Sequence, residues 1–155
     1  MARDLRLTVE PQYPLLEWAR TRCGVSGPTW SPESEAVGVL DNGELRAVVV
    51  YNDFRGDACA MHIASDHTRQ WATRNILGGL FGYAFIYKRM NRAVAVVPAA
   101  NRNAILTAVK LGFQFEGRLR AAAVDGSDAV LLSMLRDECL WLDEDATVQE
   151  DRTDG

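Results

Sequence analysis

The feature of this sequence that most constrains its fold is an Asn-Gly pair between two runs of strand-forming residues. Asn42-Gly43 separates residues 36–40 from residues 45–51. Asn-Gly in such a position is the strongest short-range signal of a β-hairpin, because both residues tolerate a positive φ angle. A second turn around Gly56 leads to a third run at 58–64. The sequence therefore predicts an antiparallel meander of three strands.

The spacing of apolar residues changes after residue 65. Apolar side chains then recur at intervals of three and four positions, namely Ile76, Leu77, Leu80, Phe81, Ala84 and Phe85. This period is typical of an amphipathic helix, and we expect one at 71–87. Gly78, Gly79 and Gly82 lie inside it, and each weakens a helix by roughly 1 kcal/mol relative to alanine. We therefore expect these glycines where the helix packs closely against the sheet.

Residues 93–97 form a continuous apolar run that ends at Pro98. Such a run is typical of a central strand covered on both faces, and a proline ends regular strand pairing. A helix is expected next at 102–111, with Asn101 as its N-cap and Gly112 just past its end.

The remaining patterns complete a mixed sheet. Strands are expected at 5–9, 113–122 and 129–135, and a short helix at about 15–23. The order of elements predicts one α/β (α+β) domain, in which an antiparallel meander lies beside a central strand–helix–strand unit. We place this domain at residues 1–142.

Charge is concentrated at the end of the chain. Residues 143–155 hold six acidic residues and one arginine, a net charge of −5, whereas the whole chain of 155 residues carries −4. The domain at 1–142 is therefore nearly neutral, which argues against a nucleic-acid-binding protein. We expect 143–155 to be an acidic, solvated tail.

Other features exclude further classes of protein. No run approaches the roughly 20 apolar residues of a membrane span, and the N-terminus has charges where a signal peptide needs its apolar run. We therefore expect no membrane contact and a cytoplasmic location. Cys23, Cys59 and Cys139 are far apart and odd in number, which argues against a disulfide framework and a zinc site.

Three stretches in the second half of the chain carry a recognisable pattern. Residues 101–104 read Asn-Arg-Asn-Ala and are followed by Lys-Leu-Gly-Phe at 110–113, Phe-Glu-Gly-Arg-Leu-Arg at 115–120 and Ser-Met-Leu-Arg-Asp-Glu-Cys-Leu-Trp at 133–141. They resemble the GNAT superfamily of acyl-CoA N-acyltransferases, and within it the branch that acetylates ribosomal-protein N-termini. They are also similar to acetyltransferase-like proteins of tailed bacteriophages, some of which are virion components.

The resemblance covers residues 35–142 and implies the GNAT fold with acetyl-CoA as a co-substrate. The family binds the pyrophosphate of acetyl-CoA at the loop before the long helix, where helix N–H groups favour an anion. The resemblance assigns this contact to Arg69, Gln70, Thr73 and Arg74. Thr68 and Gln70 stand where the family has glycines, which narrows the loop.

The resemblance also implies contacts for the rest of the cofactor. The pantetheine arm is expected to pair like a β-strand with the splayed strand edge at Ile63 and Ala64. Asn101 is expected to reach the arm or the acetyl group. The alternative is that Asn101 serves only as a helix cap, although one residue can fill both roles.

Acetyl transfer needs a base for the amine proton and an acid for the leaving thiolate. The family's tyrosine acid corresponds to Ala108, which carries no such group. His62 is the candidate catalytic residue, because it lies on the fourth strand and has a useful unperturbed pKa; its competing reading is a structural or surface histidine. Tyr51, Asp53 and Glu116 are further candidates. The competing reading of Glu116 is a solvated strand residue or a partner for Arg118 or Arg120.

Two functions remain open from the sequence. The first is an N-acetyltransferase that moves an acetyl group from acetyl-CoA to a primary amine, such as a protein N-terminus, a lysine or a small amine. The second is a catalytically diverged structural or assembly protein, located in a bacteriophage virion and bound to an assembly partner. The aromatic end around Trp141 is compatible with a homodimer in either case.

Overall fold

The structure is a computed structural model that describes residues 3–23 and 30–142, so the predicted tail at 143–155 lies outside the described residues. The elements in chain order are β1 (Leu5–Thr8), α1 (Gln12–Arg22), β2 (Glu35–Asp41), β3 (Glu44–Arg55), β4 (Ala58–Ser65), α2 (Arg74–Gly82), the π-helix η1 (Tyr83–Tyr87), β5 (Arg92–Pro98), α3 (Arg102–Leu111), β6 (Gln114–Leu119), β7 (Ala129–Leu135) and the 3-10 helix η2 (Arg136–Glu138).

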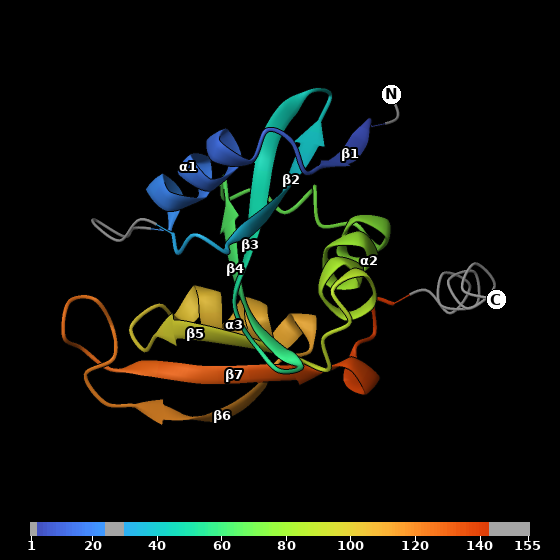
Figure 1. Cartoon of the computed structure of the whole chain (residues 1–155). Helices are drawn as coiled ribbons and strands as arrows, with labels where there is room; N and C mark the ends of the chain where they lie inside the picture. Colours follow the sequence, from blue (N-terminus) through green and yellow to red (C-terminus); the bar gives the residue numbers. More distant parts are fainter. Residues whose placement is uncertain (1–2, 24–29, 143–155) are drawn as a thin grey trace.

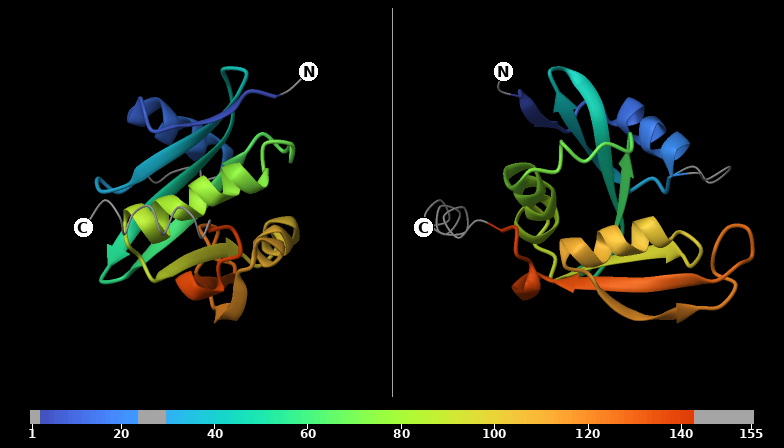
Figure 2. Two further views of the ribbon diagram at one scale, coloured as in Figure 1. Left: turned by 90° about the vertical axis from the view of Figure 1, so that its right-hand side faces the viewer. Right: turned by 180° about the vertical axis from the view of Figure 1, so that it is seen from behind.

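The seven strands form one mixed sheet in the order β1-β2-β3-β4-β5-β7-β6. Every neighbouring pair is antiparallel except β4 and β5, which are parallel and joined through α2. The predicted fold class is confirmed: a meander of β2, β3 and β4 adjoins a central strand–helix–strand unit. Figure 1 shows the meander and the C-terminal strands running in clearly different directions, and the views of Figure 2 show the same division.

Helices cover both faces of the meander. On β3, the buried side chains of Val48 and Val50 pack with α1, whereas those of Val49 and Tyr51 pack with α2 and η1. Successive side chains of a strand point to opposite faces, so α1 and α2 lie on opposite sides of the sheet. Helix α3 covers β5 and β7 (Figure 1).

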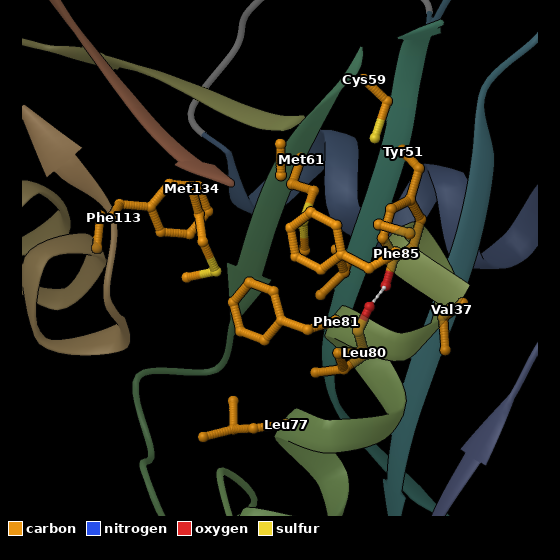
Figure 3. Packing of buried hydrophobic residues seen from close by; sticks show 14 of the residues in the cluster. Val37, Tyr51, Cys59, Met61, Leu77, Leu80, Phe81, Phe85, Phe113 and Met134 are labelled. Atoms are coloured by element: carbon orange, nitrogen blue, oxygen red, sulfur yellow. Dashed lines mark hydrogen bonds between the residues drawn. The ribbon is translucent and has the colours of Figure 1, made fainter. Parts of the chain in front are cut away.

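The core between the sheet and α2 is anchored by one buried hydrogen bond. The fully buried hydroxyl of Tyr51 donates to the carbonyl oxygen of Leu80 at 2.6 Å, as Figure 3 shows. The rings of Phe81 and Phe85 fill the space beside it, 6.4 Å apart between centroids. This bond fixes α2, and with it the loop that precedes α2, against β3.

The helix predicted at 71–87 begins later and ends differently. The side chain of Thr73 accepts a hydrogen bond from the backbone N–H of Ile76, which makes Thr73 the N-cap and Arg74 the first helical residue. The last five residues form a π-helix, which apolar spacing cannot distinguish from an α-helix. Within the described ranges, no helix is long and apolar enough to cross a membrane.

The three glycines of this helix have different surroundings. A Cβ atom at Gly79 would overlap the side chain of Leu7 on β1, so the predicted close packing against the sheet is confirmed there. At Gly78 the Cβ would lie 2.9 Å from the carbonyl oxygen of Trp141, which belongs to the C-terminal segment and not to the sheet. At Gly82 it would meet no atom within 4 Å, so the prediction is wrong for that position.

Candidate functional site

Strands β4 and β5 separate soon after they meet. They pair at only three positions, from Ala58 opposite Arg92 to Ala60 opposite Val94. Strand β4 then continues beside β3 to Ser65, and β5 continues beside β7, in the different directions seen in Figure 1. Within the described part of the chain, no strand pairs with the two inner edges beyond these positions. Their backbone N–H and C=O groups can therefore pair with an extended ligand.

Apolar side chains are exposed where the strands separate. Ile63 on β4 is 37% exposed and Val96 on β5 is 46% exposed. The prediction that residues 93–97 are covered on both faces is therefore wrong for the face that carries Val96. The side chain of Ala64 is buried against α1, but its backbone lies on the unpaired edge with that of Ile63, where the sequence placed the pantetheine contact. That contact itself stays a prediction.

The loop between β4 and α2 is partly closed by its own side chains. The carboxylate of Asp66 accepts hydrogen bonds from the backbone N–H of Thr68 at 3.0 Å and from its hydroxyl at 2.5 Å. Ser65 accepts from the N–H of His67, which has a positive φ of 70°. Two backbone N–H groups that a glycine-rich loop would leave open are thus already paired. Arg46 contacts Asp66 at 3.2 Å and offsets its negative charge.

The next three residues of the loop have backbone N–H groups without a partner in the described ranges. The backbone N–H groups of Arg69, Gln70 and Trp71 have no acceptor among the described residues. The indole N–H of Trp71 donates to the carbonyl oxygen of Thr68 at 2.8 Å, and its ring is buried, so this side chain anchors the loop. The N-terminus of α2 follows at Arg74. Free N–H groups at a helix N-terminus suit a phosphate group.

The four predicted pyrophosphate contacts differ in availability. Arg69 has an exposed side chain that binds no other described residue. Gln70 accepts a hydrogen bond from Arg3, Arg74 donates to the carbonyl oxygen of Leu140 at 3.3 Å, and Thr73 caps α2. The exposed residues Arg69 and Gln70, whose backbone N–H groups have no acceptor among the described residues, offer donors that suit a pyrophosphate, but fewer than a glycine-rich loop would offer. The four contacts stay a prediction.

His62 lies on β4 just past the last pair with β5. Its half-buried ring is on the α1 face, opposite the Met61 side chain in the α2 core, as strand alternation predicts. The Nε2 atom lies 2.9 Å from the Oδ1 atom of Asn52, and the ring centroid lies 5.2 Å from that of Trp30. Burial lowers the pKa of His62, partly offset by the charge of Asp53. The neutral imidazole can therefore accept a proton at neutral pH.

Two other candidates are held in structural interactions. The hydroxyl of Tyr51 is in the core, as described above, and burial raises its pKa. Glu116 binds Arg92 through two hydrogen bonds of 2.7 and 2.8 Å and also accepts from Ser133. Donation by Arg92 and Ser133 lowers the pKa of Glu116 to about 2. Glu116 is exposed on β6, as one of its two predicted readings has it, but its predicted pairing with Arg118 or Arg120 is wrong. Its partner is Arg92 of β5, and the irregularity of β6 lies at this residue.

The remaining sequence candidates are also placed. Asp53 pairs with Arg55 at 2.7 Å. The side chain of Asn101 accepts from the N–H of Ala104 at 3.2 Å, so its predicted role as the cap of α3 is confirmed, and its contact with the cofactor stays a prediction. Ala108 is buried in the core. The position where the family carries its acid therefore offers no proton.

Sequence reasoning missed the surroundings of His62. Asn52 and Trp30 lie beside its ring, and neither stood out in the sequence as a partner for it. Counting residues back from the turn at Gly56 gives a register for the pairing of β3 with β4. An irregularity between Asn52 and Arg55 shifts the true register away from it. Among the described residues, no group of three or more His, Cys, Asp or Glu side chains could hold a metal ion.

Solved structures that are similar to this one include acetyltransferases. The spermidine N-acetyltransferase SpeG of Vibrio cholerae, in a variant form, aligns with a TM-score of 0.72 at 15% identity over 88% of this chain and 96% of that one. SpeG in complex with manganese ions aligns with a TM-score of 0.67 at 15% identity, over 84% and 92% of the two chains. A probable acetyltransferase aligns with a TM-score of 0.62 at 14% identity, over 86% and 94%.

The chain has the GNAT fold. At these identities the likeness concerns the fold alone. Searches against protein-family models and against curated protein sequences found no match. The unpaired edge of β4 and the loop before α2 are the parts of the fold where the sequence resemblance places contacts with acetyl-CoA.

Proposed function

We propose that this protein is an N-acetyltransferase that moves an acetyl group from acetyl-CoA to a primary amine by direct transfer. One observation supports the proposal: beyond its last pair with β5, the unpaired edge of β4 leads directly to the N-terminus of α2 through a loop in which three backbone N–H groups have no acceptor among the described residues. In this proposal the amide groups of the pantetheine arm pair with the strand edge, and the pyrophosphate contacts the loop next to it. GNAT acetyltransferase structures support the assignment.

The residues of the chain would divide the work as follows. The backbone of Ile63 and Ala64 pairs with the pantetheine arm, and Arg69 with the N–H groups of residues 69–71 holds the pyrophosphate. His62 accepts the proton that the amine nitrogen loses as it bonds to the acetyl carbon and the carbon–sulfur bond breaks. A thiol has a pKa of about 8.5, so its thiolate can leave and take a proton from water. The alanine at 108 then lowers the rate without preventing the reaction.

The acceptor is a primary amine of one of three kinds. Spermidine is the first to test, because the solved structures of similar fold include spermidine acetyltransferases. A peptide with a free N-terminus follows from the sequence resemblance to the ribosomal-protein branch, and lysine completes the set.

A second candidate is a GNAT-shaped assembly protein without catalysis, of the kind that some tailed bacteriophages carry. Two observations favour it: the buried Ala108 at the acid position, and the backbone N–H of Thr68, which Asp66 occupies. The first leaves the site without the family's acid, and the second takes up a backbone N–H that could otherwise bind the cofactor.

One assay separates the two functions. The purified protein is incubated with radiolabelled acetyl-CoA and each of the three amines, and both free thiol and labelled amine are measured. The enzyme predicts release of thiol that depends on the amine and equals the amount of labelled amine, and a loss of both in Arg69→Glu. No label in any amine, with a stable stoichiometric protein partner, would favour the assembly protein.

A further inference from the structure

A series of hydrogen bonds connects an exposed carboxylate to His62. The Oε1 atom of Glu33 lies 2.8 Å from the hydroxyl of Ser31, which lies 3.1 Å from the hydroxyl of Ser34. The Nδ2 atom of Asn52 lies 3.3 Å from the same Ser34 oxygen, and the Oδ1 atom of Asn52 lies 2.9 Å from Nε2 of His62. These five residues, the relay, join the segment before β2 to β3 and β4.

The carboxylate fixes the direction of the first bonds in the relay. The pKa of Glu33 is lowered, because its own backbone N–H and the Ser31 hydroxyl donate to it. An ionised carboxylate only accepts, so Ser31 must give its single proton to Glu33. Ser31 then accepts from Ser34, which uses the Ser34 proton. Ser34 is left to accept, and only the amide N–H of Asn52 can donate to it.

These hydrogen bonds also determine which nitrogen of the imidazole carries the proton. Because the Nδ2 atom of Asn52 donates to Ser34, its Oδ1 atom must be the one that faces His62. A carbonyl oxygen only accepts, so Nε2 of His62 carries the proton. A neutral imidazole has one N–H, which leaves the lone pair on Nδ1. Reversing all the bonds would leave no hydrogen between the oxygens of Ser31 and Glu33, which are 2.8 Å apart.

The other groups around His62 leave this assignment in place. The indole N–H of Trp30 donates to the carbonyl oxygen of Leu16 at 2.8 Å, which holds the tryptophan ring beside the imidazole. Asp53 contributes a negative charge, but its carboxylate pairs with Arg55. Its backbone N–H donates to Glu33 at 3.4 Å and thus keeps that carboxylate in position.

We propose that Asn52 is a positioning residue, oriented by Glu33 through the two serines, which holds neutral His62 with its proton on Nε2 and its lone pair on Nδ1. This inference rests on the proposed function in one respect, namely that the Nδ1 lone pair is the base that accepts the proton of the acceptor amine. The tautomer itself follows from the hydrogen bonds and can be measured on the protein without substrate.

Nitrogen NMR of protein labelled with 15N-histidine tests the tautomer. The chain has two histidines, so His67→Gln identifies the signals of His62. The relay predicts that Nε2 of His62 is protonated and Nδ1 is not. In Ser31→Ala the Asn52 amide is free to reverse, so the fraction of His62 protonated on Nδ1 rises by about fivefold, the shift expected from one hydrogen bond of ordinary strength.

A matched control is available at a distant turn. The hydroxyl of Ser127 also donates to a carboxylate, that of Asp125, so Ser127→Ala removes the same kind of bond and leaves the His62 signals unchanged. A wild-type His62 that is protonated on Nδ1 would overturn the relay. Equal tautomer fractions in Ser31→Ala and Ser127→Ala would overturn it as well.

Kinetics then test the role in catalysis. Asn52→Ala is expected to lower kcat with little change in the KM for acetyl-CoA. Asn52→Asp places a carboxylate beside the imidazole, so the acid limb of the pH–rate profile moves to higher pH. A profile that does not move would overturn the role of Asn52. If no amine is acetylated while the NMR result is as predicted, the base role of His62 fails and the fixed tautomer stands.

Discussion

The phenolic oxygen of Tyr51 is the single atom whose removal best tests how α2 is held on the sheet. Tyr51→Phe removes this buried atom, which donates to Leu80 at 2.6 Å, and keeps the ring, whose centroid lies 4.7 Å from that of Tyr83. A buried acceptor that loses its donor costs about 1–3 kcal/mol. We expect the free energy of unfolding to fall by about 2 kcal/mol, which lowers Tm by roughly 4–8 °C in a chain of this size.

Urea unfolding followed by circular dichroism measures this change. The slope of the unfolding free energy against urea concentration should be the same as in wild type. The control is Tyr13→Phe, because Tyr13 is 75% exposed, and its effect should stay within about 0.5 kcal/mol. A Tyr51→Phe variant as stable as this control would refute the anchoring role. Turnover below the unfolding temperature should be unchanged in Tyr51→Phe, and a folded but inactive variant would instead make Tyr51 a catalytic residue.

Three further changes test other parts of the structure. Gly82→Ala should raise the free energy of unfolding by about 0.5–1 kcal/mol, because alanine favours the helix and its Cβ meets no atom. Gly78→Ala should lower the free energy of unfolding, since its Cβ would press on the Trp141 carbonyl, and equal urea midpoints for the two variants would contradict this. Asn101→Ala should lower stability by about 1 kcal/mol through loss of the α3 cap, and a raised KM for acetyl-CoA would reveal the cofactor contact as well. Burial lowers the pKa of His62 below its unfolded value, so stability should be lost as pH falls below about 6.5. The urea midpoint of wild type should therefore change more between neutral pH and about pH 5 than the midpoint of His62→Gln. An equal change in the two proteins would contradict the lowered pKa of His62.

The fold could be predicted from the sequence where short-range chemistry decides the conformation. The hairpin at Asn42-Gly43 forms with positive φ angles of 52° and 84°, and α3 lies between its Asn101 cap and Gly112 at a φ of 114°. The end of the long helix could not be predicted, because the π-helix η1 keeps a spacing of apolar residues that also suits an α-helix.

The candidate site was predictable in part. The resemblance located the unpaired strand edge at Ile63 and the loop at Arg69, and the structure shows the strand separation that makes such an edge available. Two features depend on tertiary structure and left no local signal. The carboxylate of Asp66 closes part of the loop, and the irregularity in β3 brings Asn52 to His62.

The most direct test of the account is isothermal titration of the protein with acetyl-CoA. Arg69→Glu reverses the charge in the loop before α2, and Arg120→Glu makes the same change just beyond β6, in a different segment of the chain. The account predicts micromolar binding for wild type and Arg120→Glu, and its loss in Arg69→Glu. No heat at millimolar acetyl-CoA, or equal affinity in all three proteins, would contradict a cofactor site between β4, β5 and the start of α2.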